Sequence, residues 1–453
     1  MTRRYFTGTN AALFTDLYEL TMAQAYVAEG MVEPGTFSLF YRKLPDQRNF
    51  TLACGVEDVV GFLEEVRFSD EDIDYLRKQE LFSRQFLDYL ADFRFTGDVC
   101  AVPDGTPVFP LEPVVEVTAP LPEAQIMETW IMNQVHVQTV LATKAARIVT
   151  AAQGRAVLDF GLRRIHGADA GLKAGRAFHI AGLTGTSNVL AGRVYGLPIS
   201  GTMAHSYIQA HDDEMEAFRA FVREFPDTVL LVDTYDTLRG VRRVVQLAEE
   251  LGDDFRVRGI RLDSGDLADL ARRSRTLLDD AGLEDVSIFA SGGLDEFSIA
   301  QLVEDDVPID GFGVGTAMGV SADAPDLDIA YKLVEYGGKG RMKLSSGKET
   351  LPGPKQVFRH YQDGSATHDV LGRRTEDLDG EPLLQPYLSG GQRVRAVVTA
   401  DEARERAQRE IAALPAAIRH IRRAGKPYDV RLSFALAAHR DEVRDVVRSI
   451  AER

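Results

Sequence analysis

The stretch "RVRGIRLDSGDLADLARRSRTLLDDAG", residues 256–282, contains one complete repeat of the pattern that decides the fold. A strand-like run ends in a cluster of Asp, Ser and Gly, and leucines at helical spacing follow it. Asp and Ser are typical of helix starts, and Gly282 marks the expected end of the helix. The stretch therefore predicts a strand, a turn and a helix in succession.

Strand-like runs of this kind recur between about residue 155 and residue 320. There are seven: "RAVLDFGLRR", "RAFHIAGLTGTS", "LPISGTMAHS", "TVLLVDTYDT", "RVRGIRLDSGD", "VSIFASGGLDE" and "VPIDGFGVGTAMG". Strands that alternate with helices predict right-handed βαβ units and a parallel sheet. Seven units predict an α/β fold built on an irregular (β/α) barrel, in which ligands bind at the carboxyl ends of the strands. An open sheet would place them at the same ends.

The regions that flank the barrel have a different composition. Pro- and Val-rich runs and helical patterns precede it, and Gly- and Lys-rich β-like runs follow it. We expect a second α+β domain that is built from the N-terminal region and the segment after the barrel. The predicted boundaries are an N-terminal α+β domain at 1–140, the barrel at 141–325, a β-rich return segment at 326–400 and a C-terminal helical segment at 401–453.

Composition narrows the classes of protein further. Of the 453 residues 45% are apolar and 27% are charged, which is typical of a globular protein. The net charge of −17 argues against a nucleic-acid partner, and no apolar run approaches the roughly 20 residues that span a bilayer. Two cysteines support neither a disulfide framework nor a cysteine-based zinc site. Without a recognisable signal peptide, the chain is expected to be cytoplasmic.

Two consecutive glycine-rich turns, "FASGGLDE" and "GFGVGTAMGVS", follow the last two strand-like runs. Glycines let backbone N–H groups approach an anion, and the last two loops of a barrel often bind phosphate. Tight turns that need a positive φ are the alternative explanation. The phosphate interpretation assigns Gly292, Gly293, Gly315 and Thr316 to the site.

Arg261 and Asp263 lie two residues apart at a strand end, so their side chains leave the same face of the strand. A guanidinium beside a carboxylate suits an anionic substrate with hydroxyl groups, or a bound Mg²⁺. Helix capping by Asp263 or Ser264 is the structural alternative.

Other strand ends carry further polar and aromatic candidates. Asp233 in "VDTYDT" could orient an imidazole or cap a helix. In "DFGLRR", Phe160 could cover a ligand and Arg163 could bind phosphate. His205 in "GTMAHS" is either a structural histidine or a catalytic one. The sequence contains no HExxH, CxxC, GxSxG or Walker A pattern.

These motifs, in this order, resemble those of the nicotinate phosphoribosyltransferases. The resemblance also rests on the segments "TDLYELTMAQAY", "ATKAARI", "GLTGTSNVLAG", "IRLDSGDL", "YKLVEYGGKGRMKLS" and "LPGPKQVFR". It implies a type II phosphoribosyltransferase, a homodimer with shared active sites, that joins nicotinate to 5-phosphoribosyl 1-pyrophosphate. The products are nicotinate mononucleotide and pyrophosphate, and the reaction uses ATP and Mg²⁺ in NAD biosynthesis.

The resemblance also implies a role for individual residues. His205 is expected to be phosphorylated by ATP, Asp233 to hold its imidazole, and Asp263 to arrange the ribose, pyrophosphate and Mg²⁺. The pyridine ring is expected to lie between Phe160 and the partner subunit's Tyr18, with Arg261 at the ring and its carboxylate. Further expected contacts come from Thr186 in the substrate-binding loop and, for phosphate, from Arg42, Arg163 and Lys173.

Ser187 bears on the choice of substrate. Related nicotinamide-using enzymes carry an aspartate in the corresponding loop, where a carboxylate would repel nicotinate and a serine can donate a hydrogen bond. The sequence therefore favours nicotinate.

The alternatives are a quinolinate phosphoribosyltransferase, which has neither the histidine nor the stacking tyrosine, and a non-catalytic barrel that binds phosphorylated ligands.

Overall fold

The computed structural model describes residues 11–345 and 350–451, and the chain forms two compact units. The first unit contains the residues up to Thr143 and those from Ala324 onward, and the second runs from Lys144 to Asp323. The chain passes from the first to the second inside the long helix α6 (Glu128–Ala152). Each of three predicted segments includes residues outside the described ones. These are 1–10 in the N-terminal domain, 346–349 in the return segment and 452–453 in the C-terminal segment.

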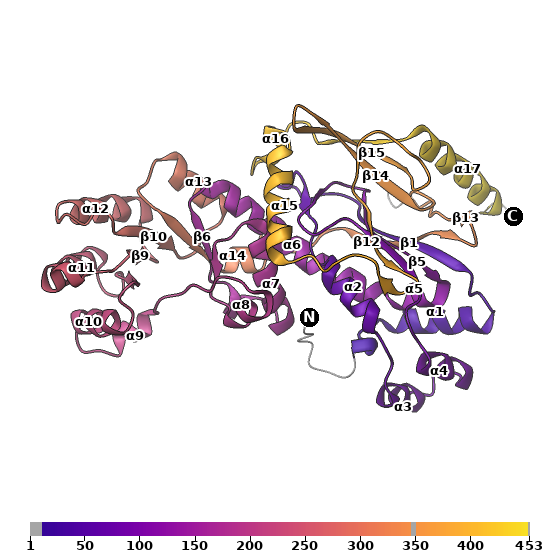
Figure 1. The fold of residues 1–453 in the computed structure, drawn as a ribbon, viewed down its shortest axis with the longest axis horizontal. Coiled ribbons are helices and arrows are strands. Elements are labelled where there is room, and N and C mark those ends of the chain that lie inside the picture. The colour runs from indigo at the N-terminus through magenta and orange to yellow at the C-terminus, as the bar shows by residue number, and fades with distance from the viewer. Residues whose placement is uncertain (1–10, 346–349, 452–453) are drawn as a thin grey trace. The chain divides into compact units, whose positions relative to one another are not determined.

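A curled parallel sheet of six strands forms the centre of the second unit (Figure 1). Its strands, in the order β7-β6-β11-β10-β9-β8, are β6 (Ala156–Asp159), β7 (Gly185–Thr186), β8 (Val229–Leu231), β9 (Gly259–Leu262), β10 (Ser287–Ser291) and β11 (Gly311–Val314). The edge strands β7 and β8 are not hydrogen-bonded to each other in the described part of the chain. The sheet is therefore a half-barrel, and the predicted α/β class with an irregular barrel is confirmed.

Helices connect these strands. They are α7 (Ala168–Ala181), α8 (Val189–Tyr195), α9 (His205–Gln209), α10 (Glu214–Glu224), α11 (Thr237–Leu251), α12 (Leu267–Asp279), α13 (Glu296–Glu304) and α14 (Thr316–Gly319), with 3-10 turns η2 (Leu162–Arg164) and η3 (Gly252–Asp254). The predicted strand–turn–helix at 256–282 is present as β9 and α12. The helix cap is Asp266, which accepts hydrogen bonds from two backbone N–H groups of the first turn. The expectation that Asp263 or Ser264 caps this helix is wrong, and both side chains are left for other contacts.

Two of the seven predicted strands differ in the structure. "RAFHI" belongs to helix α7, whose residues from Gly171 to Ala181 are all buried. A helix that is buried on every side has the same continuous apolar pattern as a buried strand, so periodicity alone does not separate them. "LPIS" contributes only the isolated bridge between Thr186 and Ile199.

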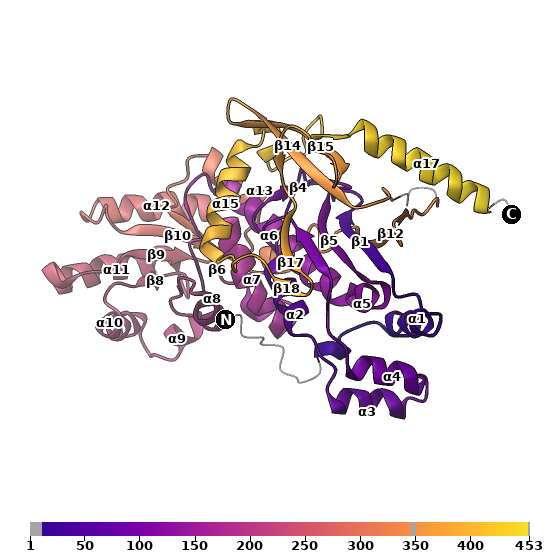
Figure 2. The ribbon, with the colours of Figure 1, turned by 45° about the vertical axis from the view of Figure 1, so that its right-hand side comes forward.

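The described residues of the first unit form three sheets. The largest, in the order β13-β12-β1-β5-β3-β17-β18, consists of β1 (Pro34–Tyr41), β3 (Asp98–Ala101), β5 (Pro113–Pro120), β12 (Ile329–Tyr336), β13 (Lys339–Gly340), β17 (Gln385–Ser389) and β18 (Gln392–Arg393). The others are β16-β14-β15-β19, made of β14 (Lys355–Gln362), β15 (Ser365–Arg373), β16 (Glu381–Pro382) and β19 (Asp429–Leu432), and the pair β2 (Thr51–Leu52) and β4 (Pro107–Val108). Figure 2 shows β1, β5, β12 and β17 of the largest sheet. Strand β12 pairs with β1, and β17 pairs with β3. Segments that precede the half-barrel in the sequence therefore share one sheet with segments that follow it.

Helices on the N-terminal side of this unit are α1 (Leu17–Ala28), α2 (Val56–Glu65), α3 (Asp70–Lys78), α4 (Arg84–Ala91) and α5 (Leu121–Ile126), after the 3-10 turn η1 (Ala11–Leu13). Helices α15 (Ala400–Ala413), α16 (Ala416–Arg419) and α17 (Phe434–Ala451) follow the sheets. The segment from residue 401 is not purely helical, since β19 pairs in parallel with β15. In the described residues, no helix has both the length and the apolar character that crossing a membrane requires.

Candidate active site

A cavity of about 510 Å³ lies at the carboxyl ends of the strands in the second unit. Its lining combines the predicted residues Phe160, Arg163, Ser187, Arg261, Asp263, Gly292, Gly293, Gly315 and Thr316. Strands or strand-to-helix turns of β6, β7, β9, β10 and β11 supply these residues. Residues spread over about 150 positions of sequence are thus gathered because the carboxyl ends of parallel strands meet at one edge.

Arg261 and Phe160 form one wall of this cavity. The Arg261 guanidinium carbon lies 5.6 Å from the centre of the Phe160 ring, and its Nη2 donates to the Met203 carbonyl at 2.8 Å. The Nε of Arg261 is buried and has no hydrogen-bond partner in the described chain. Burial lowers the pKa of Arg261 below its usual value, with nearby Asp263 and Asp233 acting in the opposite direction. The pair offers an aromatic face and a cation with unused donor capacity.

Gly313 allows Phe160 to take this position. A Cβ atom at Gly313 would lie 2.4 Å from the Phe160 ring, so any larger residue in β11 would displace the ring. Phe160 follows β6, and its backbone N–H donates to Val314 of β11. Two neighbouring strands therefore determine the position of the aromatic wall.

Asp263 and Asp233 link adjacent strand ends. Asp233 Oδ2 accepts hydrogen bonds from the backbone N–H of Asp263 at 2.9 Å and from the Ser264 hydroxyl at 2.6 Å. The Ser291 hydroxyl donates to Asp263 Oδ1. The other oxygen of Asp233 is buried without a partner in the described residues. This arrangement leaves carboxylate oxygen atoms available beside the arginine.

His205 begins α9, on the loop that follows the bridge at Ile199. Its Nδ1 lies 3.1 Å from the Thr234 hydroxyl, and its Nε2 lies 3.8 Å from Asp263 Oδ2. The expectation that Asp233 holds the imidazole is not met in this structure, since Asp233 bonds to the turn after β9. Thr234, the next residue along the chain, takes that place.

The glycine turns form another part of the cavity lining. Gly292 has φ +89°, and a Cβ there would lie 1.9 Å from the Asp263 carbonyl oxygen, so only glycine fits between β10 and the turn after β9. Arg164 Nη1 donates to the Thr316 hydroxyl at 2.8 Å, and both residues line the cavity with Arg163. Two arginines, a hydroxyl and glycine backbone are a donor set that suits phosphate oxygens.

Six predicted residues do not line this cavity: His205 and Asp233, whose contacts are described above, and Thr186, Lys173, Tyr18 and Arg42. Thr186 is buried, with its hydroxyl on Asp159, and Lys173 pairs with Asp169 at 2.8 Å. Tyr18 and Arg42 belong to the first unit. Tyr18 is about half exposed on α1, and Arg42 pairs with Asp328 at 3.0 Å.

Asp159 is a site residue that sequence reasoning missed. Its buried carboxylate accepts from the Gly161 N–H at 2.8 Å and from the Thr186 hydroxyl at 2.7 Å, which ties the ends of β6 and β7 together around Phe160 and Ser187. Burial raises the pKa of Asp159, although its two hydrogen bonds act in the opposite direction. A carboxylate as the last residue of an apolar strand was the available signal.

The described residues contain no group of three or more His, Cys, Asp or Glu side chains placed to hold a metal ion. A Mg²⁺ that binds mainly to substrate phosphates needs only one or two protein carboxylates. Asp263 and the partnerless oxygen of Asp233 fit that requirement.

An α/β half-barrel with an arginine, carboxylates and glycine turns at its strand ends defines an enzyme-like site for a phosphorylated ligand. Models of the nicotinate phosphoribosyltransferase N-terminal domain and of the nicotinate phosphoribosyltransferase family match residues 13–136 and 156–347. A nicotinate phosphoribosyltransferase of Mycobacterium tuberculosis is 55% identical over 423 residues, 93% of this chain and 91% of that protein. One from Bacillus subtilis is 41% identical over 84% of this chain and 80% of its own length.

A solved structure gives the same result at the level of the fold. The crystal structure of human nicotinic acid phosphoribosyltransferase superposes with a TM-score of 0.85 at 30% identity, over 95% of this chain and 99% of that one. The chain belongs to the nicotinate phosphoribosyltransferase family.

Proposed function

We propose that this enzyme transfers the phosphoribosyl group of 5-phosphoribosyl 1-pyrophosphate to nicotinate, which yields nicotinate mononucleotide and pyrophosphate for NAD biosynthesis. The two family models and the 55% identical relative support this activity. The observation that carries it at the level of the site is one cavity that contains both the Arg261–Phe160 wall and the glycine-turn wall. A pyridine carboxylate and a phosphorylated sugar each find complementary groups there.

The pyridine ring would lie against Phe160, and the carboxylate of nicotinate would accept hydrogen bonds from Arg261 and Ser187. Arg261 supports this role because its Nε is buried without a partner. Tyr18 of the partner subunit would cover the other face of the ring in a homodimer with shared active sites. Its exposed position on α1 leaves it accessible for such a contact.

The donor's 5′-phosphate would bind at Gly292, Gly293, Gly315, Thr316 and Arg163. The nitrogen of nicotinate attacks the anomeric carbon of the ribose, and the bond from that carbon to the pyrophosphate oxygen breaks. Pyrophosphate leaves with the electron pair, and the pyridine nitrogen becomes cationic.

Mg²⁺ would neutralise part of the pyrophosphate charge, and Asp263 and Asp233 would hold it. Arg42 and Lys173 stay proposals for phosphate contact, although each is engaged in an ion pair here. Cys54 and Cys100 form no disulfide in the described residues, which is compatible with the reducing cytoplasm that we propose as the enzyme's location.

ATP would transfer its γ-phosphoryl group to His205 and leave as ADP. If Nδ1 donates its proton to Thr234, the lone pair of the ring stays on Nε2, which then acts as the nucleophile. Hydrolysis of the phosphohistidine would couple the free energy of ATP to product formation.

The test offers nicotinate, nicotinamide and quinolinate in parallel, each with phosphoribosyl pyrophosphate and with or without ATP. Of the three pyridine substrates, only nicotinate is expected to give product, and ATP is expected to increase the amount of product formed. Product from quinolinate with release of CO₂, or no product at all, would contradict the proposal. With [γ-³²P]ATP, acid-labile label is expected on the wild type and absent from His205→Ala. Equal labelling of the two proteins would refute the phosphohistidine and leave the transfer reaction standing.

A further inference from the structure

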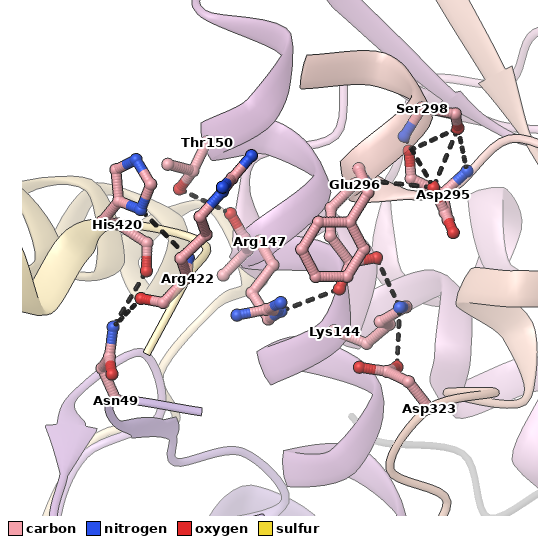
Figure 3. A network of polar contacts seen from close by, with 12 residues as sticks. Asn49, Lys144, Arg147, Thr150, Asp295, Glu296, Ser298, Asp323, His420 and Arg422 are labelled. Carbon is pink, nitrogen blue, oxygen red and sulfur yellow. Dashed lines mark hydrogen bonds and ion pairs between the residues drawn. The ribbon is translucent and has the colours of Figure 1, made fainter. Parts of the chain in front are cut away.

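Lys144 and Arg147 of the "ATKAARI" segment have no part in the reaction described above, yet both side chains are almost completely buried. They lie on the part of α6 that belongs to the second unit, and both bind Glu296, which is fully buried (Figure 3). Lys144 Nζ bonds to one carboxylate oxygen of Glu296, and Arg147 Nε donates to the other at 2.8 Å. Lys144 also pairs with Asp323 at 2.7 Å.

Glu296 is the first residue of α13 and follows the glycine turn Ser291–Asp295 directly. Asp295 caps the same helix through the backbone N–H groups of Phe297 and Ser298. At its other end, the turn is fixed by the close approach of Gly292 to the Asp263 carbonyl. The ion pairs of Glu296 therefore anchor the end of the turn that leads into α13.

The charges at this anchor are balanced. A buried carboxylate beside an anion-binding turn disfavours a bound phosphate, since like charges repel strongly where water is excluded. Lys144 and Arg147 contribute two positive charges, and Glu296 and Asp323 contribute two negative ones. If Lys144 lost its charge, Glu296 would lose one of the two cations bonded to it and Asp323 would lose its pairing with Lys144, and a buried charge that loses a partner is costly.

We propose that Lys144 and Arg147 are positioning residues for the phosphoribosyl donor. Through Glu296 they hold the Ser291–Asp295 turn in place, and they neutralise a carboxylate that would otherwise oppose the donor's phosphate. This inference rests on the proposed function, because it takes that turn as the site of the 5′-phosphate.

The experiment compares Lys144→Met, Glu296→Gln and the double variant with the wild type. Lys144→Met is expected to raise KM for phosphoribosyl pyrophosphate by about tenfold, the scale of coupling within one ion-pair network. KM for nicotinate is expected to change less than about twofold, because Arg261 and Phe160 do not contact the network. The double variant is expected to recover only the part of the donor affinity that the uncompensated carboxylate costs, because it removes that carboxylate together with its cation but also removes the anchor of the turn.

Two further measurements separate positioning from general loss of structure. Titration calorimetry with ribose 5-phosphate reports binding of a 5′-phosphate without turnover, and thermal unfolding reports stability. Arg219→Met, which breaks the exposed ion pair with Glu250 in the same unit, is the matched control and should change neither KM. If Lys144→Met lowered only the unfolding temperature, or raised both KM values equally, the inference would be wrong.

The assumption about the turn has its own control. A Cβ at Gly293 meets no atom within 4 Å, but Gly293 has φ +67°, so Gly293→Ala adds a methyl group to the cavity wall and also strains the backbone of the turn. It is expected to raise the donor KM. An unchanged donor KM in Gly293→Ala would remove the basis of the inference, whereas a wild type without nicotinate-dependent product would refute the proposed function itself.

Discussion

Arg261 in the half-barrel and Arg359 in β14 are both buried, but they differ in how many of their donors are used. Arg359 donates to both oxygens of Asp369, with Nη2 at 2.7 Å, and Nη2 also bonds to the Pro107 carbonyl. Although burial alone would lower it, Asp369 raises the pKa of Arg359 above its usual value. Arg261 bonds to one backbone carbonyl, and burial lowers its pKa.

The comparison extends to the carboxylates. Asp369 accepts from Arg359 and from the Tyr428 hydroxyl at 2.9 Å, so its charge is compensated inside the protein. Asp233 has one buried oxygen without a partner in the described chain. The Nη1 of Arg359 also lacks a hydrogen-bond partner in the described chain, so the difference lies in the directly bonded opposite charge, which Arg359 has in Asp369 and Arg261 does not have. Buried charges that are bonded to an opposite charge contribute to the fold, whereas buried charges without one mark where a ligand can complete the set. The predictions below test that distinction.

Asp369→Ala is expected to give the largest effect. It leaves Arg359 buried without its main partner, which typically costs about 3–5 kcal/mol of unfolding free energy. Chemical denaturation followed by circular dichroism measures this loss. The exposed pair Arg219–Glu250 is the control, and Arg219→Met should leave stability unchanged within error. A loss in Asp369→Ala no greater than in the control would contradict the distinction.

Glu19 on α1 is a buried carboxyl that has no cation among its partners in the described residues. It is fully buried, and burial raises its pKa to about 7, opposed by hydrogen bonds from Thr129 and Thr15. Its folded pKa lies above the unfolded value, so the folded state binds more protons between about pH 4.5 and pH 7. The unfolding free energy should therefore fall as pH rises through this window, by on the order of 3 kcal/mol, and Glu19 should add no further change above it.

Glu19→Gln removes this titration while it keeps a hydrogen-bonding group of the same size. Chemical denaturation of both proteins at pH 5 and at pH 8 gives their unfolding free energies. The change in unfolding free energy between the two pH values should be smaller in the variant than in the wild type. The other titrating groups are common to both proteins and cancel in the comparison. Equal pH dependence in the two proteins would show that Glu19 does not titrate in this range.

Arg261→Met is expected to affect activity rather than stability. It removes a cation whose remaining donors we assign to the nicotinate carboxylate. Hydrogen bonds to charged groups contribute about 1.5–3 kcal/mol, so kcat/KM for nicotinate should fall roughly 100-fold. The unfolding midpoint should stay near that of the wild type, in contrast to Asp369→Ala. A large loss of stability with unchanged kcat/KM would place Arg261 with Arg359 as a structural residue.

Much of this site could be predicted because strand ends carry a local signal. Arg261, Asp263 and the glycines at 292 and 315 follow apolar runs, and parallel strands bring such ends together whatever the details of packing. Thr234 could not be distinguished from Asp233 by the same reasoning. Adjacent residues at a strand end point to opposite faces, and only the three-dimensional positions of β8 and α9 decide which one meets His205.

The Lys144–Glu296 pair lies beyond such local reasoning, since 152 residues separate its members. Helix α7 was also misread, because an all-round apolar pattern carries no period that tells a buried helix from a strand. Register and burial, which decide both cases, come from tertiary packing. The residues at the carboxyl ends of the strands can be predicted from the sequence, whereas the long-range contacts that hold these ends in place cannot.

Ser187→Asp gives the smallest expected effect and the sharpest test of how uncompensated charge sets specificity. Ser187 lines the cavity with Arg261, and an aspartate there would repel the carboxylate of nicotinate but accept a hydrogen bond from the amide of nicotinamide. The ratio of kcat/KM for nicotinate to that for nicotinamide should fall about tenfold, equivalent to about 1.4 kcal/mol. Ser187→Asn, similar in size and without charge, is the matched control. If both variants changed the ratio equally, shape rather than charge at position 187 would set the preference, and the proposed role of charge repulsion at this position would be wrong.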